Sequence, residues 1–213
     1  AGQSVLNRLL AGESCALMTD AGTPAISDPG EDLVRLCAEN GVEVRAIPGC
    51  CAAVNALAVS GLPTGRFTFE GFLTVNKKSR REHLNSLKGE TRTMIFHEAP
   101  HKLRTTLNDL TEAFGPDRRI SLCRELTKLH EEVLRFTLAE AVSYYEENAP
   151  KGEYVLVVAG AAPKTGAVVT LEDGVAQVLA LKEQGMRLKD AAKEVAEHTG
   201  LSKNELYAAA LER

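Results

Sequence analysis

The sequence predicts two α/β domains followed by a short C-terminal tail that is entirely helical. Short apolar runs alternate with amphipathic segments as far as residue 158, whereas only helix-like patterns follow residue 170. Turn clusters rich in Gly and Pro follow the apolar runs, as expected where parallel strands joined by helical crossovers end. We place an N-terminal α/β domain at 1–64, a second α/β domain at 65–162 and a helix-turn-helix-like tail at 170–213.

The N-terminal domain is expected to alternate helices with buried strands. Asp28 is interpreted as a helix N-cap with Pro29 at the first helical position, and Gly61 ends a helix of small residues. In order, we expect the end of a helix at 1–11, a strand at 15–19, a helix ending at Gly41, a strand at 42–47 and a helix at 52–60.

The second domain begins at a phenylalanine-rich segment in which apolar and polar residues alternate. Thr137 and Glu140 form a capping box that should begin a helix. The expected order is a half-exposed strand at 66–73, a strand at 91–96, a helix at about 100–114, a strand at 120–123, a helix from 137 to about 148 and a strand at 154–158.

The tail after residue 170 carries helix signals only. Thr170 with Asp173, and Ser202 with Glu205, read as capping boxes, while Gly185 and Gly200 separate three short helices. The plain alternative to a binding module is a small stabilising bundle.

The charge of the chain is unevenly distributed. Its 213 residues carry a formal charge of −4, which excludes a uniformly basic coat but not a local patch. Residues 76–104 hold eight basic against three acidic side chains, whereas residues 170–213 hold six against eight, so the tail could contact RNA with one face only. The ordinary explanation of such a basic run is a solvated helix start. The functional explanation is contact with the phosphates of RNA. The RNA-binding candidates are Lys77, Lys78, Arg80 and Arg81.

Membrane and metal signals are weak. No run approaches the roughly 18 apolar residues that a membrane-spanning helix needs, and no leader-like segment opens the chain, so we expect a cytoplasmic protein. Its five cysteines lack paired metal-ligand spacing, which fits a reducing compartment and predicts no metal site.

Two loops in the N-terminal domain could bind a ligand through backbone groups. Residues 20–24, Asp-Ala-Gly-Thr-Pro, follow an expected strand, and Pro48-Gly-Cys-Cys-Ala52 follows the next and opens into a helix. We expect these loops to converge. Cys50 and Cys51 lack a nearby cation in sequence that would activate a thiolate, so packing or backbone contact is favoured over thiol chemistry.

Two further loops place ionisable side chains after strands of the second domain. Residues 97–102, His-Glu-Ala-Pro-His-Lys, permit acid–base chemistry, with metal binding as a less favoured alternative. Arg124-Glu-Leu-Thr-Lys128 follows the next strand, where an ordinary ion pair is the simplest interpretation. Charged groups after successive strands at one sheet edge are also what a shared cleft would produce.

Six strings occur in an order that resembles a known family. They are Asp20-Ala-Gly-Thr-Pro-Ala-Ile-Ser-Asp-Pro-Gly30, Pro48-Gly-Cys-Cys-Ala52 with Ser60-Gly-Leu-Pro63, Phe69-Glu-Gly-Phe-Leu73, Glu98-Ala-Pro-His101, Arg124-Glu-Leu-Thr-Lys128 and Gly152-Glu-Tyr-Val-Leu156. Together they resemble the tetrapyrrole methylase superfamily, in particular its branch that methylates small-subunit ribosomal RNA.

The resemblance implies S-adenosylmethionine as methyl donor, bound in a cleft between the two α/β domains. It also implies a homodimer and, as acceptor, a cytidine ribose 2′-hydroxyl of 16S RNA in the small (30S) ribosomal subunit. Carried over by position, the donor site would comprise Asp20, Ala21, Gly22, Thr23, Pro24, Ile26, Pro48, Gly49, Cys50, Cys51, Ala52, Phe96 and His97.

The family's opening strand, with its Thr-Pro-Ile-Gly-Asn-Leu loop and a later Glu-Asp-Thr-Arg string, has no counterpart in this sequence. We therefore expect an N-terminally truncated chain, and activity of this chain alone is left open. Because a ribose hydroxyl is a weak nucleophile, we expect Glu98 as a base or orienting group and Arg124 as its electrostatic partner. Two alternatives stay open: methylation of a tetrapyrrole-like small molecule, and a non-catalytic RNA-binding protein with a methylase-like fold.

Overall fold

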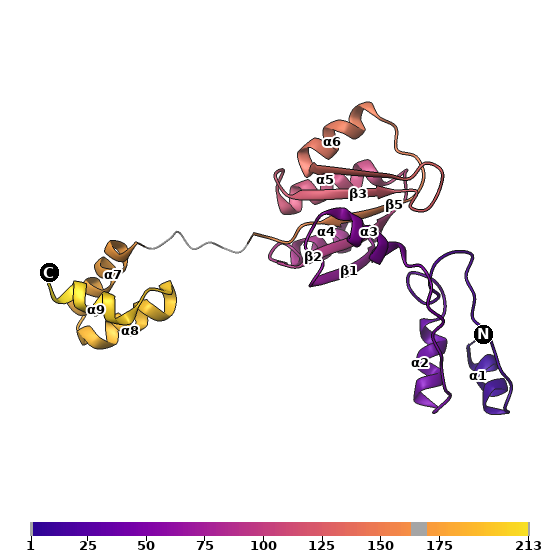
Figure 1. The fold of residues 1–213 in the computed structure, drawn as a ribbon, viewed down its shortest axis with the longest axis horizontal. Coiled ribbons are helices and arrows are strands. Elements are labelled where there is room, and N and C mark those ends of the chain that lie inside the picture. The colour runs from indigo at the N-terminus through magenta and orange to yellow at the C-terminus, as the bar shows by residue number, and fades with distance from the viewer. Residues whose placement is uncertain (1, 163–169, 213) are drawn as a thin grey trace. The chain divides into compact units, whose positions relative to one another are not determined.

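The computed structural model describes residues 2–162 and 170–212. The chain divides into two compact units, 1–161 and 162–213 (Figure 1). We also expect a small, Gly/Ala/Pro-containing linker at 159–166, of which residues 163–166 lie outside the described residues. The boundary that we place near residue 64 stays a prediction.

A mixed five-stranded sheet forms the centre of the first unit, in the order β1-β2-β5-β3-β4. Only β1 and β2 pair in parallel, while β2–β5, β3–β5 and β3–β4 are antiparallel, so the expectation of parallel strands is wrong for most of the sheet. The strand last in sequence lies between β2 and β3. The strands are β1 (Phe67–Phe72), β2 (Thr93–Glu98), β3 (Arg119–Arg124), β4 (Glu132–Thr137) and β5 (Tyr154–Val158).

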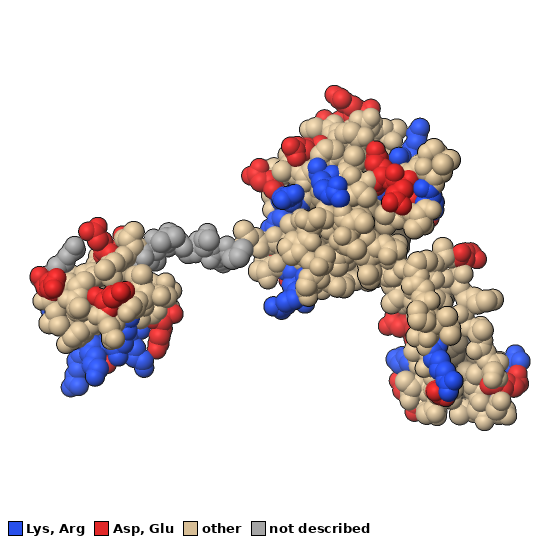
Figure 2. All heavy atoms as spheres, viewed as in Figure 1, with Lys and Arg blue, Asp and Glu red and all other residues tan. Residues whose placement is uncertain are grey.

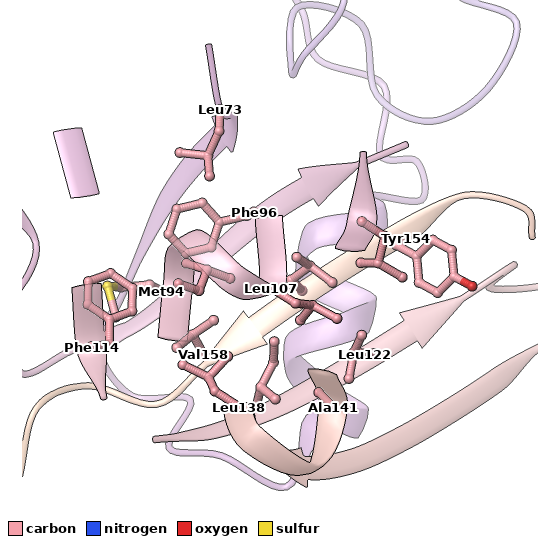
Figure 3. Packing of buried hydrophobic residues seen from close by; sticks show 14 of the residues in the cluster. Leu73, Met94, Phe96, Leu107, Phe114, Leu122, Leu138, Ala141, Tyr154 and Val158 are labelled. Carbon is pink, nitrogen blue, oxygen red and sulfur yellow. The ribbon is translucent and has the colours of Figure 1, made fainter. Parts of the chain in front are cut away.

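The larger core covers one face of this sheet. Met94 and Phe96 of β2 alternate with Ile95, which faces the other way, and they pack with residues of α5 such as Leu107 (Figure 3). The Thr137–Glu140 capping box is present and begins α6, as predicted. The helices associated with this core are α4 (Lys77–Ser86), α5 (Leu103–Phe114) and α6 (Leu138–Glu147).

The opposite face is covered by α3 (Ala52–Ser60), whose bounds match the prediction. Its small side chains, Ala53 and Ala56, let the helix approach β2, β3 and β5 closely, where they pack against Ile95 and Val157. Gly61 ends the helix in the left-handed conformation with φ 77°, which a residue without Cβ adopts at no steric cost.

The N-terminal segment differs from the prediction. The helix α1 (Gly2–Leu10) packs on α2 (Glu31–Glu39), but residues 15–19 and 42–47 are not strands in the described structure. Neither segment pairs with a neighbouring strand, and apolar content alone cannot supply the ladder hydrogen bonds that define one. Gly30, not Asp28, is the residue at the N-cap of α2.

The second unit is a helical bundle of α7 (Leu171–Glu183), α8 (Leu188–Thr199) and α9 (Lys203–Leu211). The Thr170–Asp173 capping box is present, whereas Ser202 caps α9 through its own hydroxyl without the reciprocal Glu205 bond. None of the helices in the described residues is long and apolar enough to cross a membrane.

Candidate functional site

The two glycine-containing loops converge, as predicted. The hydroxyl of Thr23 donates to the carbonyl oxygen of Cys50 over 3.0 Å, which ties the loop at 20–24 to the loop that opens into α3. A Cβ at Gly22 would lie 3.8 Å from the same carbonyl oxygen, and its φ of 78° favours glycine. The loops therefore present a common backbone surface.

A row of side chains crosses the α3-facing side of the sheet at one edge. Phe72 of β1 is in register with His97 of β2, His97 with Val155 of β5, and Val155 with Cys123 of β3. Side chains in one cross-strand row point to the same face. The row forms the sheet side of the site, opposite the two loops.

Loops and row enclose a cavity of about 470 Å³, within the range of small-molecule sites. Eight predicted site residues line it, from both predicted domains: Ala21, Gly22, Thr23, Ile26, Cys51, Ala52, His97 and Glu98. Seven predicted residues do not line it: Asp20, Pro24, Pro48, Gly49, Cys50, Phe96 and Arg124.

Several lining residues were not predicted. Asp28 was assigned only to a helix cap, yet it lies at the cavity. Cys123 and Val155 reach it only because β5 inserts between β2 and β3, which no local pattern indicates. The string after β3 was a usable signal for Glu125, Leu126 and Lys128, which lie within it.

The cavity rim is acidic. The Lys128 ammonium lies 3.0 Å from Glu125 and 2.9 Å from Glu153, and Asp28 adds a third carboxylate to the lining. The Glu153 backbone N–H, together with Lys128, holds the pKa of Glu125 below its ordinary value. One lysine against these three carboxylates leaves a net negative rim, which favours a cationic ligand over a phosphate.

His97 is a partly buried side chain of the cavity lining. Its ring lies edge-on to Phe69 and Phe72, with centroids 5.1 and 5.4 Å away, and its buried Nε2 has no hydrogen-bond partner in the described structure. Burial lowers the pKa of His97. The negative charges of Asp28 and Glu153 act in the opposite direction and raise it, but burial has the larger effect. The lowered pKa favours the neutral imidazole, and the buried Nε2 is not exposed to the cavity in this structure.

This lowered pKa predicts a dependence of stability on pH. Between the folded-state pKa and 6.5, the ordinary value for histidine, the unfolded chain binds more protons than the folded one. The free energy of unfolding should therefore fall as pH drops below 6.5, with a slope of at most about 1.4 kcal/mol per pH unit. Urea unfolding of wild type and His97→Gln between pH 7.5 and 5.5 checks this, and equal slopes for both proteins would contradict it.

The two predicted catalytic side chains lie on the other face of the sheet, although Glu98 still contributes to the cavity lining at the end of β2. Glu98 and Arg124 are both in register with Tyr154, one residue beyond the row that faces the cavity. Arg124 Nε lies 3.3 Å from the carboxylate of Glu132, whereas the ordinary ion pair expected within the string at 124–128 is that of Lys128 with Glu125. Glu98 is 4% exposed and both its oxygens accept hydrogen bonds, from Ala99 N–H and the Thr106 hydroxyl, which favours an orienting group over a base.

A basic groove of about 750 Å³ lies between α4 and α5. Lys77, Lys78 and Lys88 line it and form no ion pair within the described part of the chain, while Arg81 pairs with Glu112 at 3.3 Å in an exposed contact. Arg80 differs because it is 7% exposed and turned inward. Its charge is compensated by Asp109, so we no longer expect it to contact phosphate.

The helical unit also separates its charges. In Figure 2, its lysine and arginine side chains gather along one side and its acidic side chains lie mainly on the other. Contact of one face of the tail with RNA stays a prediction.

Comparisons with known proteins agree with this architecture. The sequence model of the Tetrapyrrole (Corrin/Porphyrin) Methylases matches residues 1–142, and that of the RsmI C-terminal HTH domain matches residues 169–213. Among solved structures, the methyltransferase CobJ matches with a TM-score of 0.57 at 22% identity, over 78% of this chain and 72% of that one. A likeness at this identity supports the fold only.

Curated relatives match almost the whole chain. Ribosomal RNA small subunit methyltransferase I of Synechocystis sp. is 45% identical over 99% of this chain and 75% of the relative. The proteins of that name from Pseudomonas aeruginosa and Escherichia coli O157:H7 are 44% and 41% identical, over 100% and 99% of this chain and 76% and 73% of the relatives. The sequence models and the relatives together show that the chain belongs to the ribosomal RNA small subunit methyltransferase I family of tetrapyrrole methylases.

Proposed function

We propose that this protein transfers the methyl group of S-adenosylmethionine to the ribose 2′-hydroxyl of a cytidine in small-subunit ribosomal RNA. The observation that carries the proposal is the identity of 41–45% with proteins named for this class of reaction, over nearly the whole chain. The cavity and the basic groove support it independently.

The cavity suits the donor chemically. S-adenosylmethionine carries a sulfonium and an ammonium, and the rim formed by Asp28, Glu125, Glu153 and Lys128 is net negative. A neutral His97 adds no repulsive charge to the cavity lining. The sides formed by Phe72 and Val155 can exclude water from the ligand.

The residues of the chain would act mainly by placement. The donor supplies an activated methyl group, and the protein must hold the acceptor oxygen in line with the sulfur. The loops tied by Thr23 and Cys50 would fix the donor, and the row that contains His97 would close the cavity behind it. Arg124 stays a candidate electrostatic partner, although its ion pair with Glu132 must open before it reaches a reacting group.

The test has two stages. Calorimetry with S-adenosylmethionine comes first, and absence of binding would reject both enzyme hypotheses and favour a non-catalytic RNA-binding protein. Radiolabelled donor is then offered with unmethylated 30S subunits or with a tetrapyrrole, and the RNA is digested to nucleosides. Label in 2′-O-methylcytidine is expected, whereas label in the tetrapyrrole alone would support the small-molecule alternative.

We propose that the groove between α4 and α5 contacts RNA phosphates through Lys77, Lys78, Arg81 and Lys88. Replacing Lys77 and Lys78 by alanine should weaken RNA binding and reduce its dependence on salt. Each lost phosphate contact lowers the slope of log K against log salt by about 0.7 on single strands and about 0.9 on duplexes. Fluorescence anisotropy with a small-subunit RNA fragment from 50 to 300 mM salt measures the slope.

Lys151→Ala is the matched control, because Lys151 is exposed and lies outside both the groove and the cavity. Its slope should equal that of wild type. A double variant that also keeps the wild-type slope would show that the groove does not hold RNA.

Two further proposals follow from the substrate. The first is a cytoplasmic location, because the substrate, ribosomal RNA, is found in the cytoplasm. The second is a homodimer, which the family resemblance supports. Sedimentation of the purified chain over a range of concentrations tests the second.

A further inference from the structure

A continuous buried polar chain runs from α4 through α5 to the end of β2. Arg80 Nε lies 2.6 Å from the Asp109 carboxylate, and its Nη2 donates to the Thr106 hydroxyl over 2.9 Å. Thr106 in turn donates to Glu98, whose other oxygen accepts from the Ala99 backbone N–H over 2.8 Å. Arg80, Thr106 and Glu98 are 7%, 0% and 4% exposed.

The available protons allow only one direction for the hydrogen bonds along this polar chain. A guanidinium only donates, so Thr106 must accept from Arg80 and has one proton left to give. That proton goes to Glu98, which then accepts at both oxygens. Arg80 Nη2, the Thr106 hydroxyl and both Glu98 oxygens are each paired along this chain, so the loss of the Thr106 hydroxyl would leave Nη2 and one Glu98 oxygen without a partner.

The two ends of the chain lie at different functional surfaces. The cavity is lined by Glu98, Ala99 and Pro100. The Glu98 carboxylate accepts a hydrogen bond there from the Ala99 N–H, the first backbone N–H after β2. At the other end, α4 carries Arg80 inward while Lys77 and Lys78 line the basic groove.

We propose that Thr106 and Arg80 are positioning residues for the donor cavity: through Glu98 they fix the loop at 98–100 against which the methyl donor binds. This rests on the proposed function, because it assigns the donor to that cavity. Well-packed apolar residues would stabilise such a core at least as well as a buried polar chain. What the polar chain adds is a directed bond to the backbone of one loop, which sets that loop to within a fraction of an ångström.

The experiment compares Thr106→Val, Thr106→Ser and Thr111→Val. The valine at 106 keeps the shape and removes the bridging hydroxyl, whereas serine restores it. Thr111 is the matched control on the same helix, because its hydroxyl bonds only the carbonyl of Leu107. Binding of S-adenosylmethionine is measured by calorimetry well below each unfolding midpoint, and exchange of the Ala99 amide proton is measured by NMR.

Thr106→Val should raise the donor Kd about tenfold, the ratio expected for one lost buried hydrogen bond, at unchanged stoichiometry. Its Ala99 amide should exchange faster by a similar factor. Thr106→Ser and Thr111→Val should stay within about twofold of wild type in both measurements. A role confined to stability would lower the unfolding midpoint of Thr106→Val but leave the Kd of the folded protein unchanged, and that result would overturn the proposal.

If Thr106→Val does not fold, Asp109→Asn decides, because it weakens the hold on Arg80 at a site that is only partly buried. Wild-type Kd and wild-type Ala99 exchange in this variant would also overturn the proposal. Failure of the proposed function is distinguishable, because wild type would then bind no donor at all. The exchange of Ala99 would still report whether Thr106 fixes the loop.

Discussion

Replacing Gly160 by alanine should lower the free energy of unfolding by about 3 kcal/mol, because backbone rather than a side chain occupies the space the new Cβ needs. That Cβ would lie 2.0 Å from the carbonyl oxygen of Thr91 and 2.8 Å from that of Arg92. Residue 160 follows β5, and Thr91 precedes β2, so the clash would push apart two neighbouring strands. Urea unfolding followed by circular dichroism measures the change.

Gly89→Ala is the matched control. A Cβ at Gly89 would meet no atom within 4 Å, and its φ is not in the left-handed region. Its effect should lie within about 0.5 kcal/mol of zero. Equal stability of the two variants would mean that the close approach of residues 160 and 91 is not maintained in solution.

Phe96→Ala should cost about 4 kcal/mol of stability, because Phe96 has no exposed surface and lies among Met94, Leu107 and Leu73 in the larger core (Figure 3). Removing a buried aromatic ring loses its transfer free energy and leaves a cavity that the close-packed neighbours cannot fill. The resemblance assigned Phe96 to the donor site, whereas the structure places its side chain on the opposite face. Thermal and urea unfolding measure the loss.

Phe69→Ala provides the contrast, since Phe69 is 39% exposed on the edge strand β1. We expect it to cost no more than about half as much, because less of its surface leaves water on folding. A loss as large as that of Phe96→Ala would contradict the assignment of Phe96 to the fully buried core.

Local signals predicted α3 and α6 correctly, although Asp28 does not cap α2 and Ser202 with Glu205 does not form a reciprocal box. The α3 helix follows from a run of small residues closed by Gly61, and α6 from the Thr137–Glu140 box, because both signals act within one helical turn. By contrast, β4 was not predicted. Its sequence, Glu-Val-Leu-Arg-Phe-Thr, mixes charge with apolar residues, as an edge strand can, and its pairing with β3 is not local.

The same distinction explains the site. The converging loops were predictable, because each follows an apolar run and carries its own turn residues. The row that contains His97, Val155 and Cys123 was not, because it depends on the order of strands that lie far apart in sequence. The alternation of side chains along β2 also explains the position of Glu98. Neighbouring residues of a strand point to opposite faces, so His97 faces the cavity whereas the side chain of Glu98 faces the core.

The central place of β5 has a consequence for how the protein acquires its structure. Until residues 154–158 leave the ribosome, β1 with β2 and β3 with β4 can form only separate two-stranded ribbons, which are marginal in water. The sheet therefore closes late in synthesis, through contacts between distant parts of the chain, and such contacts form slowly. A nascent chain that stalls before β5 would expose both unpaired strand edges, the kind of surface on which aggregation begins.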